Sequence, residues 1–145
     1  MANVMKPRRS INSSMVLPTP PNWFNEGQVK IYRELGAKVL DLKVWAQSDY
    51  DAFCILVDNL YGYQQASSII ADEGVLTRGR HGEWVRHPAT IARNACWTNI
   101  QPLLIAFGLT PSARAQMGLS PDEDNDPIGD FLQGTASGVE STKHH

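Results

Sequence analysis

The sequence lacks the features that mark membrane and secreted proteins. No apolar run reaches the ~18–20 residues that a transmembrane helix requires, so no membrane partner is predicted. The basic residues Lys6, Arg8 and Arg9 lie near the N-terminus, but the apolar segment of a secretory signal does not follow them. These two absences predict a cytosolic protein.

Residues that commonly carry catalysis or bind metals are also scarce. The two cysteines, Cys54 and Cys96, lie in apolar stretches, where a thiol usually behaves as a small buried hydrophobic group. His81 and His87 have no neighbouring cysteine or paired carboxylates that would complete a zinc site. The sequence also has no phosphate-binding Gly-Lys-Ser/Thr motif and no spaced acidic cluster for magnesium. It therefore predicts a binding protein without metal or cofactor, and an enzyme that pairs one of the thiols with His81 or His87 is the weaker alternative.

Charge is distributed unevenly, although the net charge of the chain is only -2. Residues 1–118 contain 12 of the 13 Lys/Arg and 9 of the 15 Asp/Glu, which gives them a net charge of +3. Residues 119–145 contain one basic and six acidic residues, a net charge of -5. A basic body with an acidic tail is typical of proteins that handle nucleic acid, and also of tails that serve only solubility.

Composition divides the chain into three parts. Residues 1–21 are rich in Pro, Ser and Asn, which predicts a flexible, basic arm and places the start of the structure near Trp23. Residues 22–118 carry the helical patterns, and they are predicted to form an oligomerisation domain because a few helices make a thin core for one subunit. Its basic residues make the same domain the candidate for DNA binding. Residues 119–145 are predicted to be an acidic, disordered tail.

Hydrophobic spacing predicts an all-α body of three to four helices built around a central helical hairpin. The first helix is expected from Trp23 to about Val39. A second, long helix is expected to be capped by Ser48 and to stop at Gly74, where a glycine can adopt positive φ.

A small β-hairpin or extended turn near residues 75–86 is predicted to interrupt the helical pattern, because the glycine-containing segment 78–84 resembles a turn between two short extended pieces. Pro88 then suits the first position of a third helix, which is expected to kink at Pro102. Thr110-Pro111 predicts a short fourth helix that closes at Gly118. The expected apolar face of the third helix consists of Ile91, Ala92, Ala95, Cys96, Ile100, Leu103, Leu104 and Phe107.

The predicted hairpin concentrates positive charge. Its basic side chains are Arg78, Arg80, Arg86 and His87, and only Glu83 opposes them. Such a turn could follow a phosphate backbone, or it could be a solvated loop whose Trp84 packs on the core. Further candidates for phosphate contact are the arm residues Lys6, Arg8 and Arg9, for which inert disorder is the alternative.

Within the acidic tail lies one apolar cluster, Ile128, Phe131 and Leu132. A lone apolar cluster in a disordered segment resembles a peptide that docks on a partner protein and becomes ordered there. The alternative is that the cluster folds back onto its own subunit.

The segment Phe107-Gly-Leu-Thr-Pro-Ser-Ala-Arg-Ala-Gln-Met-Gly118 resembles the C-terminal signature of a family of phage terminase small subunits. Further similarity lies in His87-Pro88, in the step Pro21-Asn-Trp-Phe24, and in Ser48-Asp-Tyr-Asp51 followed by Phe53-Cys54 and Tyr61. The resemblance extends over roughly residues 20–118, in the same order along the chain.

This resemblance implies a protein that forms a ring, binds double-stranded viral DNA at the packaging site and regulates the large terminase subunit. It also implies action in the cytoplasm of the infected host, without DNA cleavage or ATP hydrolysis by this chain. Arg114 of the signature is expected either to pair with a carboxylate or a helix C-terminal carbonyl, or to contact phosphate. A dimeric helical transcriptional regulator is the main rival interpretation.

Overall fold

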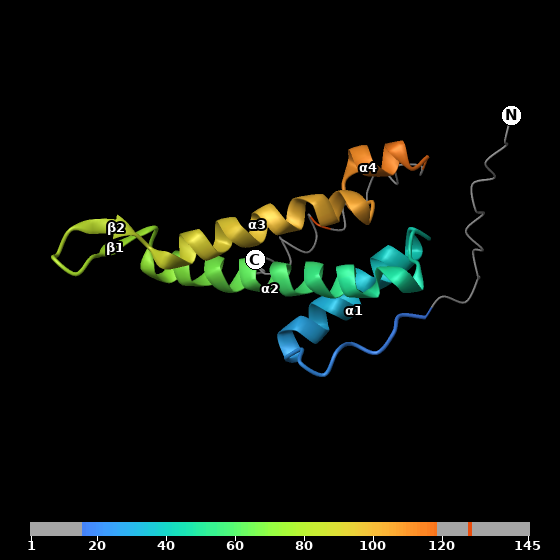
Figure 1. Ribbon diagram of the computed structural model, residues 1–145, viewed down its shortest axis with the longest axis horizontal. Coiled ribbons are helices and arrows are strands. Elements are labelled where there is room, and N and C mark those ends of the chain that lie inside the picture. The colour runs from blue at the N-terminus through green and yellow to red at the C-terminus, as the bar shows by residue number, and fades with distance from the viewer. Residues whose placement is uncertain (1–15, 119–127, 129–145) are drawn as a thin grey trace, which may run out of the picture.

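Residues 16–118 and residue 128 are described here from a computed structural model of the chain. The chain forms a long antiparallel hairpin of two helices, with shorter helices packed at one end and a β-hairpin at the other (Figure 1). The elements in chain order are α1 (Glu26–Asp41), the 3-10 helix η1 (Gln47–Asp49), α2 (Tyr50–Glu73), β1 (Leu76–Arg78), β2 (Trp84–Arg86), α3 (Pro88–Ala106) and α4 (Pro111–Gln116). The predicted helical fold with one small β-hairpin is thus confirmed.

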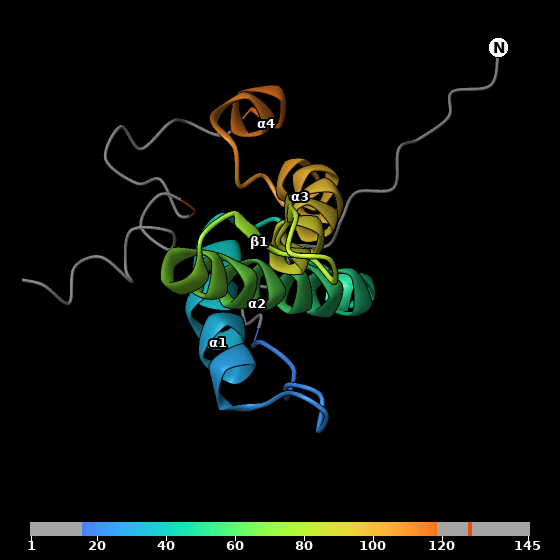
Figure 2. The same ribbon diagram turned by 90° about the vertical axis from the view of Figure 1, so that its left-hand side faces the viewer.

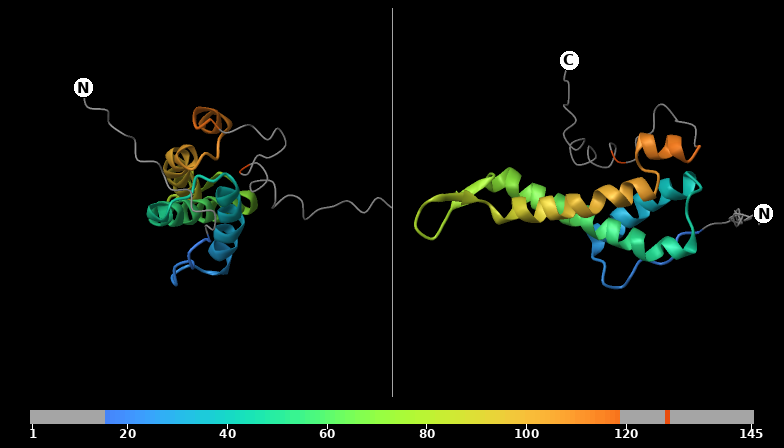
Figure 3. Two further views of the ribbon diagram at one scale, coloured as in Figure 1. Left: turned by 90° about the vertical axis from the view of Figure 1, so that its right-hand side faces the viewer. Right: turned by 45° about the horizontal axis from the view of Figure 1, so that its top comes forward.

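Helix α2 lies between α1 and α3, and α4 lies beyond α3 (Figure 2). Views from other directions show that the β-hairpin continues the long axis of α2 and α3 past their ends (Figure 3). We call the end of the α2–α3 hairpin that contacts α1 the base, and the end that carries the β-hairpin the tip. Within the described part of the chain, no helix is long and apolar enough to cross a membrane.

Helix α1 begins at Glu26, three residues later than the sequence indicated, because Asn25 forms a capping box. The Asn25 side chain accepts a hydrogen bond from the Gln28 backbone amide, and the Gln28 side chain accepts one from the Asn25 amide, both at 2.9 Å. These bonds satisfy two backbone donors of the first turn. Trp23 therefore precedes the helix and is 59% exposed.

Residues 16–21, which composition assigned to the flexible arm, lie against α1 and α2. Leu17 packs on the core, and a Cβ atom at Gly36 would lie only 2.5 Å from its Cδ1 atom. The hydroxyl of Tyr32 donates a hydrogen bond to the carbonyl of Pro18 at 2.7 Å. Prolines keep this segment extended, as expected, and it packs through side chains that the composition did not identify.

The start of α2 differs from the prediction that Ser48 caps it. Residues 47–49 form a 3-10 turn, in which the carboxylate of Asp49 accepts a hydrogen bond from the Ala46 amide at 3.1 Å. Ser48 is exposed and makes no cap, because the chain enters α2 through this tighter turn and not from an extended residue. At the other end, Gly74 has a φ of +85°, in agreement with the expected glycine stop.

The main core lies at the base and is built around aromatic rings. The ring of Phe53, on α2, contacts Tyr32, Trp45 and Phe107, with ring centroids 5.3, 5.5 and 5.6 Å apart. These partners come from α1, from the segment before η1, and from the end of α3. One aromatic side chain on α2 thus connects three other segments.

The third and fourth helices follow the predicted proline and threonine signals. Helix α3 starts at Pro88 and continues through Pro102 without interruption to Ala106. The hydroxyl of Thr110 caps α4 by accepting a hydrogen bond from the Ala113 amide at 3.2 Å. Arg114 is 8% exposed and donates to the Gly108 carbonyl at 3.4 Å, which agrees with the expected structural role.

The apolar face predicted for α3 is only partly buried. Ile100 and Leu104 are buried against the base, whereas Ile91, Ala92 and Ala95 are exposed in the single chain. The helix is apolar on more than one side, so hydrophobic spacing alone could not select the side that faces α2.

Candidate nucleic-acid interface

The β-hairpin presents two arginines and two apolar side chains on one face. Its register pairs Leu76 with Arg86 and Arg78 with Trp84 across the two strands. Directly opposite residues of antiparallel strands point to the same side, so these four side chains share a face. All four are exposed, and Trp84 is 61% exposed.

Two contacts fix the orientation of Arg78. Its guanidinium carbon lies 3.7 Å from the centroid of the Trp84 ring, in a cation–π arrangement. Its Nη1 atom also donates to the carbonyl of Gly82, in the turn, at 2.9 Å. Trp84 is therefore held by an arginine at the surface. It does not pack on the core, as the second of the two alternatives for this loop had it.

Glu83, the only acidic residue of the hairpin, is hydrogen-bonded within the turn. Its carboxylate accepts a hydrogen bond from the His81 amide at 2.9 Å, and it lies so close to Gly79 that a Cβ atom there would collide with it. Arg80 and Arg86 are exposed and have no carboxylate partner in the described part of the chain. The turn thus leaves the arginine charges available to an external anion.

His87 follows the β-hairpin and contacts the ends of both long helices. Its Nδ1 atom accepts a hydrogen bond from the Ala89 amide at 3.0 Å and so caps α3. Its Nε2 atom lies 2.5 Å from the carboxylate of Glu73, at the end of α2. The side chain is 14% exposed and both ring nitrogens have partners, so His87 positions the hairpin. The sequence indicated its cap position through Pro88 but not its partner on α2.

The charge of the described body is separated along its length. Helix α2 contains Asp51, Asp58, Asp72 and Glu73 and no basic residue, and Arg93 is the only charged residue of α3. Residues 75–93 contain four arginines and one glutamate, a net charge of +3. The other described residues contain five basic and eight acidic side chains, so net positive charge is found over residues 75–93.

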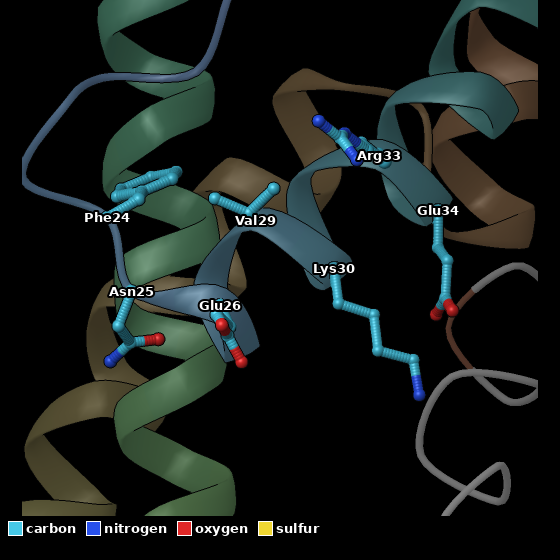
Figure 4. A pocket seen from close by; sticks show the side chains of 7 residues that line it. All are labelled: Phe24, Asn25, Glu26, Val29, Lys30, Arg33 and Glu34. Carbon is cyan, nitrogen blue, oxygen red and sulfur yellow. The ribbon is translucent and has the colours of Figure 1, made fainter.

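A groove of about 480 Å³ runs along the outer side of α1 (Figure 4). Its lining residues are Phe24, Asn25, Glu26, Val29, Lys30, Arg33 and Glu34. Two cationic and two anionic side chains balance each other there, so the groove has no net attraction for a polyanion. We do not place a nucleic-acid contact at this groove.

Some of the candidate residues lie outside the described residues: Lys6, Arg8 and Arg9 of the arm, and Phe131 and Leu132 of the tail. Ile128 is described, is half-buried, and packs against the main core cluster. For this one residue of the tail, contact with its own subunit is therefore observed.

The thiols are placed as structural residues. Cys54 is buried and Cys96 is half-buried, and burial raises the pKa of each thiol. A raised pKa lowers the fraction of reactive thiolate at neutral pH. In residues 16–118 and 128, no group of three His, Cys, Asp or Glu side chains could hold a metal ion.

The model of the family described as "Phage terminase, small subunit" matches residues 29–124. The chain belongs to this family. The match extends over most of α1, the α2–α3 hairpin, the β-hairpin and α4, so the features described above are those of a terminase small subunit with a role in packaging phage DNA. No curated protein and no solved structure matches the chain.

Proposed function

We propose that this terminase small subunit recognises double-stranded DNA at the viral packaging site and contacts it through Arg78, Arg80 and Arg86. The observation that carries the proposal is the exposed arginine face at the tip, whose only acidic neighbour within the hairpin is occupied by the turn. Each phosphate that an arginine neutralises releases counterions, so binding should weaken steeply with salt. The arm residues Lys6, Arg8 and Arg9 add contacts to the same DNA.

The subunits assemble into a closed ring in this proposal, and the outer side of α3 forms the contact between them. Five exposed, uncharged residues follow one another there at alternating spacings of four and three positions: Ile91, Ala95, Thr98, Pro102 and Ile105. This spacing keeps side chains on one stripe of a helix and is typical of helix pairs that pack knobs into holes. An exposed stripe of mostly apolar residues on a helix with a single charge favours burial against a second copy.

The ring acts by regulating the large terminase subunit and has no catalytic activity of its own. The raised pKa of the Cys54 and Cys96 thiols supports a binding role, because it leaves little reactive thiolate at neutral pH. Phe131 and Leu132 of the tail cluster are the proposed contact for the large subunit, since Ile128 packs against the core of its own subunit. The place of action is the cytoplasm of the infected host.

Replacing Arg78, Arg80 and Arg86 together by alanine tests the DNA contact. We expect weaker binding to a 60-bp duplex and a log–log salt slope lower by roughly one unit for each phosphate that is no longer neutralised. The matched control replaces Lys30, Arg33 and Lys43, three exposed cations near the base, and removes the same charge. Equal slopes in the two triple variants would place the contacts elsewhere, in the arm above all.

Mass measurement in solution separates the ring from the rival interpretation, because a transcriptional regulator of the alternative kind forms a dimer. Light scattering on the full chain should give a single species of more than two subunits. Ile91→Glu combined with Ile105→Glu should dissociate it, since two carboxylates cannot be buried unpaired between subunits. Val16→Glu, at a position 79% exposed, is the control that should leave the mass unchanged.

A further inference from the structure

The exposed face of the β-hairpin combines positive charge with a flat apolar surface. Phosphate contacts require the charge but do not require the apolar surface. Trp84 is 61% exposed at the far end of the molecule, and residues 76–86 contribute no residue to the main core cluster. Trp84 lies opposite Arg78 and on the same face as Arg86, so the flat apolar surface adjoins the positive charge.

The dimensions of the hairpin suit the major groove of duplex DNA. Strands lie about 4.8 Å apart and rise about 3.3 Å per residue, so a ribbon of two strands fits a groove about 12 Å wide. By the same geometry the diagonal pair Arg78 and Arg86 is about 7–8 Å apart at the backbone. The ribbon projects past the ends of α2 and α3, which leaves both of its strands accessible (Figures 1 and 3).

The contact between Arg78 and Trp84 determines which of these side chains meets the bases. The guanidinium covers one side of the indole and donates to the Gly82 carbonyl, so the ring has a preferred orientation before any DNA is bound. Such a ring loses little conformational freedom on binding. The indole N–H makes no hydrogen bond within the described part of the chain, so it can donate to an acceptor on a base edge.

We propose that the face of Leu76, Arg78, Trp84 and Arg86 enters the major groove, and that Trp84, positioned by Arg78, is a determinant of sequence preference. Arg80 and Arg86 hold the adjacent phosphates. The partner is duplex DNA because a hairpin with a net charge of +2, whose one carboxylate is hydrogen-bonded within the turn, complements a polyanion. This inference rests on the proposed function, since it requires that the hairpin binds DNA at all.

The test compares two 60-bp duplexes. One is enriched by the wild-type full-length protein from a random-sequence pool, and the other has the same bases in scrambled order. Trp84→Ala should lower the ratio of the two affinities about tenfold, in the range expected when one base-specific interaction is removed, and should leave the salt slope unchanged. Arg86→Ala should weaken binding to both duplexes and reduce the slope, with the ratio retained.

The matched control is Trp23→Ala, which removes a tryptophan of nearly equal exposure, 59%, from the base end of the molecule. Its affinity ratio should equal that of the wild type. Trp84→Phe, which keeps a flat ring beneath Arg78, should retain more discrimination than Trp84→Ala. Circular dichroism and the mass in solution should be unchanged in all variants, because both tryptophans are exposed.

Three results would overturn the inference. The wild type could enrich no sequence from the pool, Trp84→Ala could keep the full affinity ratio, or Trp84→Ala could bind both duplexes normally and lose only stimulation of the large subunit. The last result would assign the face to a protein partner. If the triple arginine variant also bound DNA normally, the proposed function would fail together with this inference; if that variant lost binding, only the role of Trp84 would be wrong.

Discussion

The base and the tip of the α2–α3 hairpin are packed by different kinds of side chain. At the base, large aromatic rings from three segments surround Phe53, which is fully buried. At the tip, the buried cluster consists only of Ala66, Ile70 and Ala89. The large apolar residues Val75, Leu76 and Trp84 are exposed there.

This difference separates stability from binding. Aromatic side chains bury a large area and make specific ring contacts, so the base can fix the positions of the helices. Small residues at the tip let α2 and α3 approach closely but contribute little buried area. The tip can therefore carry side chains chosen for a partner, because the base maintains the fold.

The largest effect is expected from Phe53→Ala. The substitution removes the ring that α1, α3 and Trp45 contact and leaves a cavity, which should cost about 3–5 kcal/mol of the free energy of unfolding. Urea unfolding, followed by tryptophan fluorescence, measures the loss. Ile55→Ala is the control on the same helix: Ile55 is 54% exposed, and its loss should stay within about 0.5 kcal/mol. Similar losses in both variants would show that the base core does not dominate stability.

A smaller and local effect is expected from Ile70→Ala at the tip. It should lower the stability of the tip by about 2 kcal/mol, since Ile70 is the only large member of its buried cluster. Hydrogen exchange should accelerate in residues 66–73 and 88–93, while amides near Phe53 keep their protection. Ile69→Ala, at a neighbouring exposed position, should change neither region. Acceleration throughout the chain would mean that tip and base unfold as one unit.

The base and tip also differ in how well the sequence predicted them. Pro88, Pro111 and Thr110 act within a few residues of their own position, so their helix starts could be predicted and are confirmed. The glycine stop and the β-hairpin depend on equally local backbone preferences. The prediction that Ser48 caps α2 was wrong, because the chain forms a 3-10 turn there instead. That turn follows Trp45, whose position depends on a tertiary contact with Phe53.

Features that depend on pairs distant in the sequence could not be predicted. The bond between Glu73 and His87 and the packing of Leu17 on Gly36 require knowledge of which helices are neighbours. The candidate site was predicted as a set of charges, Arg78, Arg80 and Arg86, since charge is visible in composition. The register of the strands, which places Trp84 beside Arg78, was not predicted.

Tyr32→Phe tests the N-terminal segment that closes the base. It removes the hydrogen bond to the Pro18 carbonyl and should cost about 1 kcal/mol at neutral pH. Burial, with smaller effects of Cys54 and Tyr50, raises the pKa of Tyr32 to about 12. The folded chain thus holds this proton more tightly than the unfolded chain, so the stabilisation is complete below the ordinary pKa of 10.0 and is lost as the pH rises toward 12.

The measurement is the free energy of unfolding as a function of pH. The wild type should lose more stability than Tyr32→Phe between the two pKa values. Tyr50→Phe removes the comparable but exposed bond to the Thr19 carbonyl and should cost less at neutral pH. If both variants followed the wild-type curve, residues 16–21 would not contribute to the stability of the base.

The smallest effect is expected from single charges at the two ends of α2. Asp72 lies at the tip, two residues before Gly74, whereas Asp51 lies in the first turn at the base, and both are exposed. Removing a negative charge near the arginine face should strengthen DNA binding, but exposed charges are screened over about 10 Å at 0.1 M salt. Asp72→Asn should therefore raise the affinity for a 60-bp duplex less than about threefold at low salt, and not measurably at high salt. Asp51→Asn changes the same charge at the other end and should leave the affinity unchanged. A gain of equal size in both variants would mean that the affinity depends on the net charge of the whole subunit. The result would contradict a DNA contact at the tip.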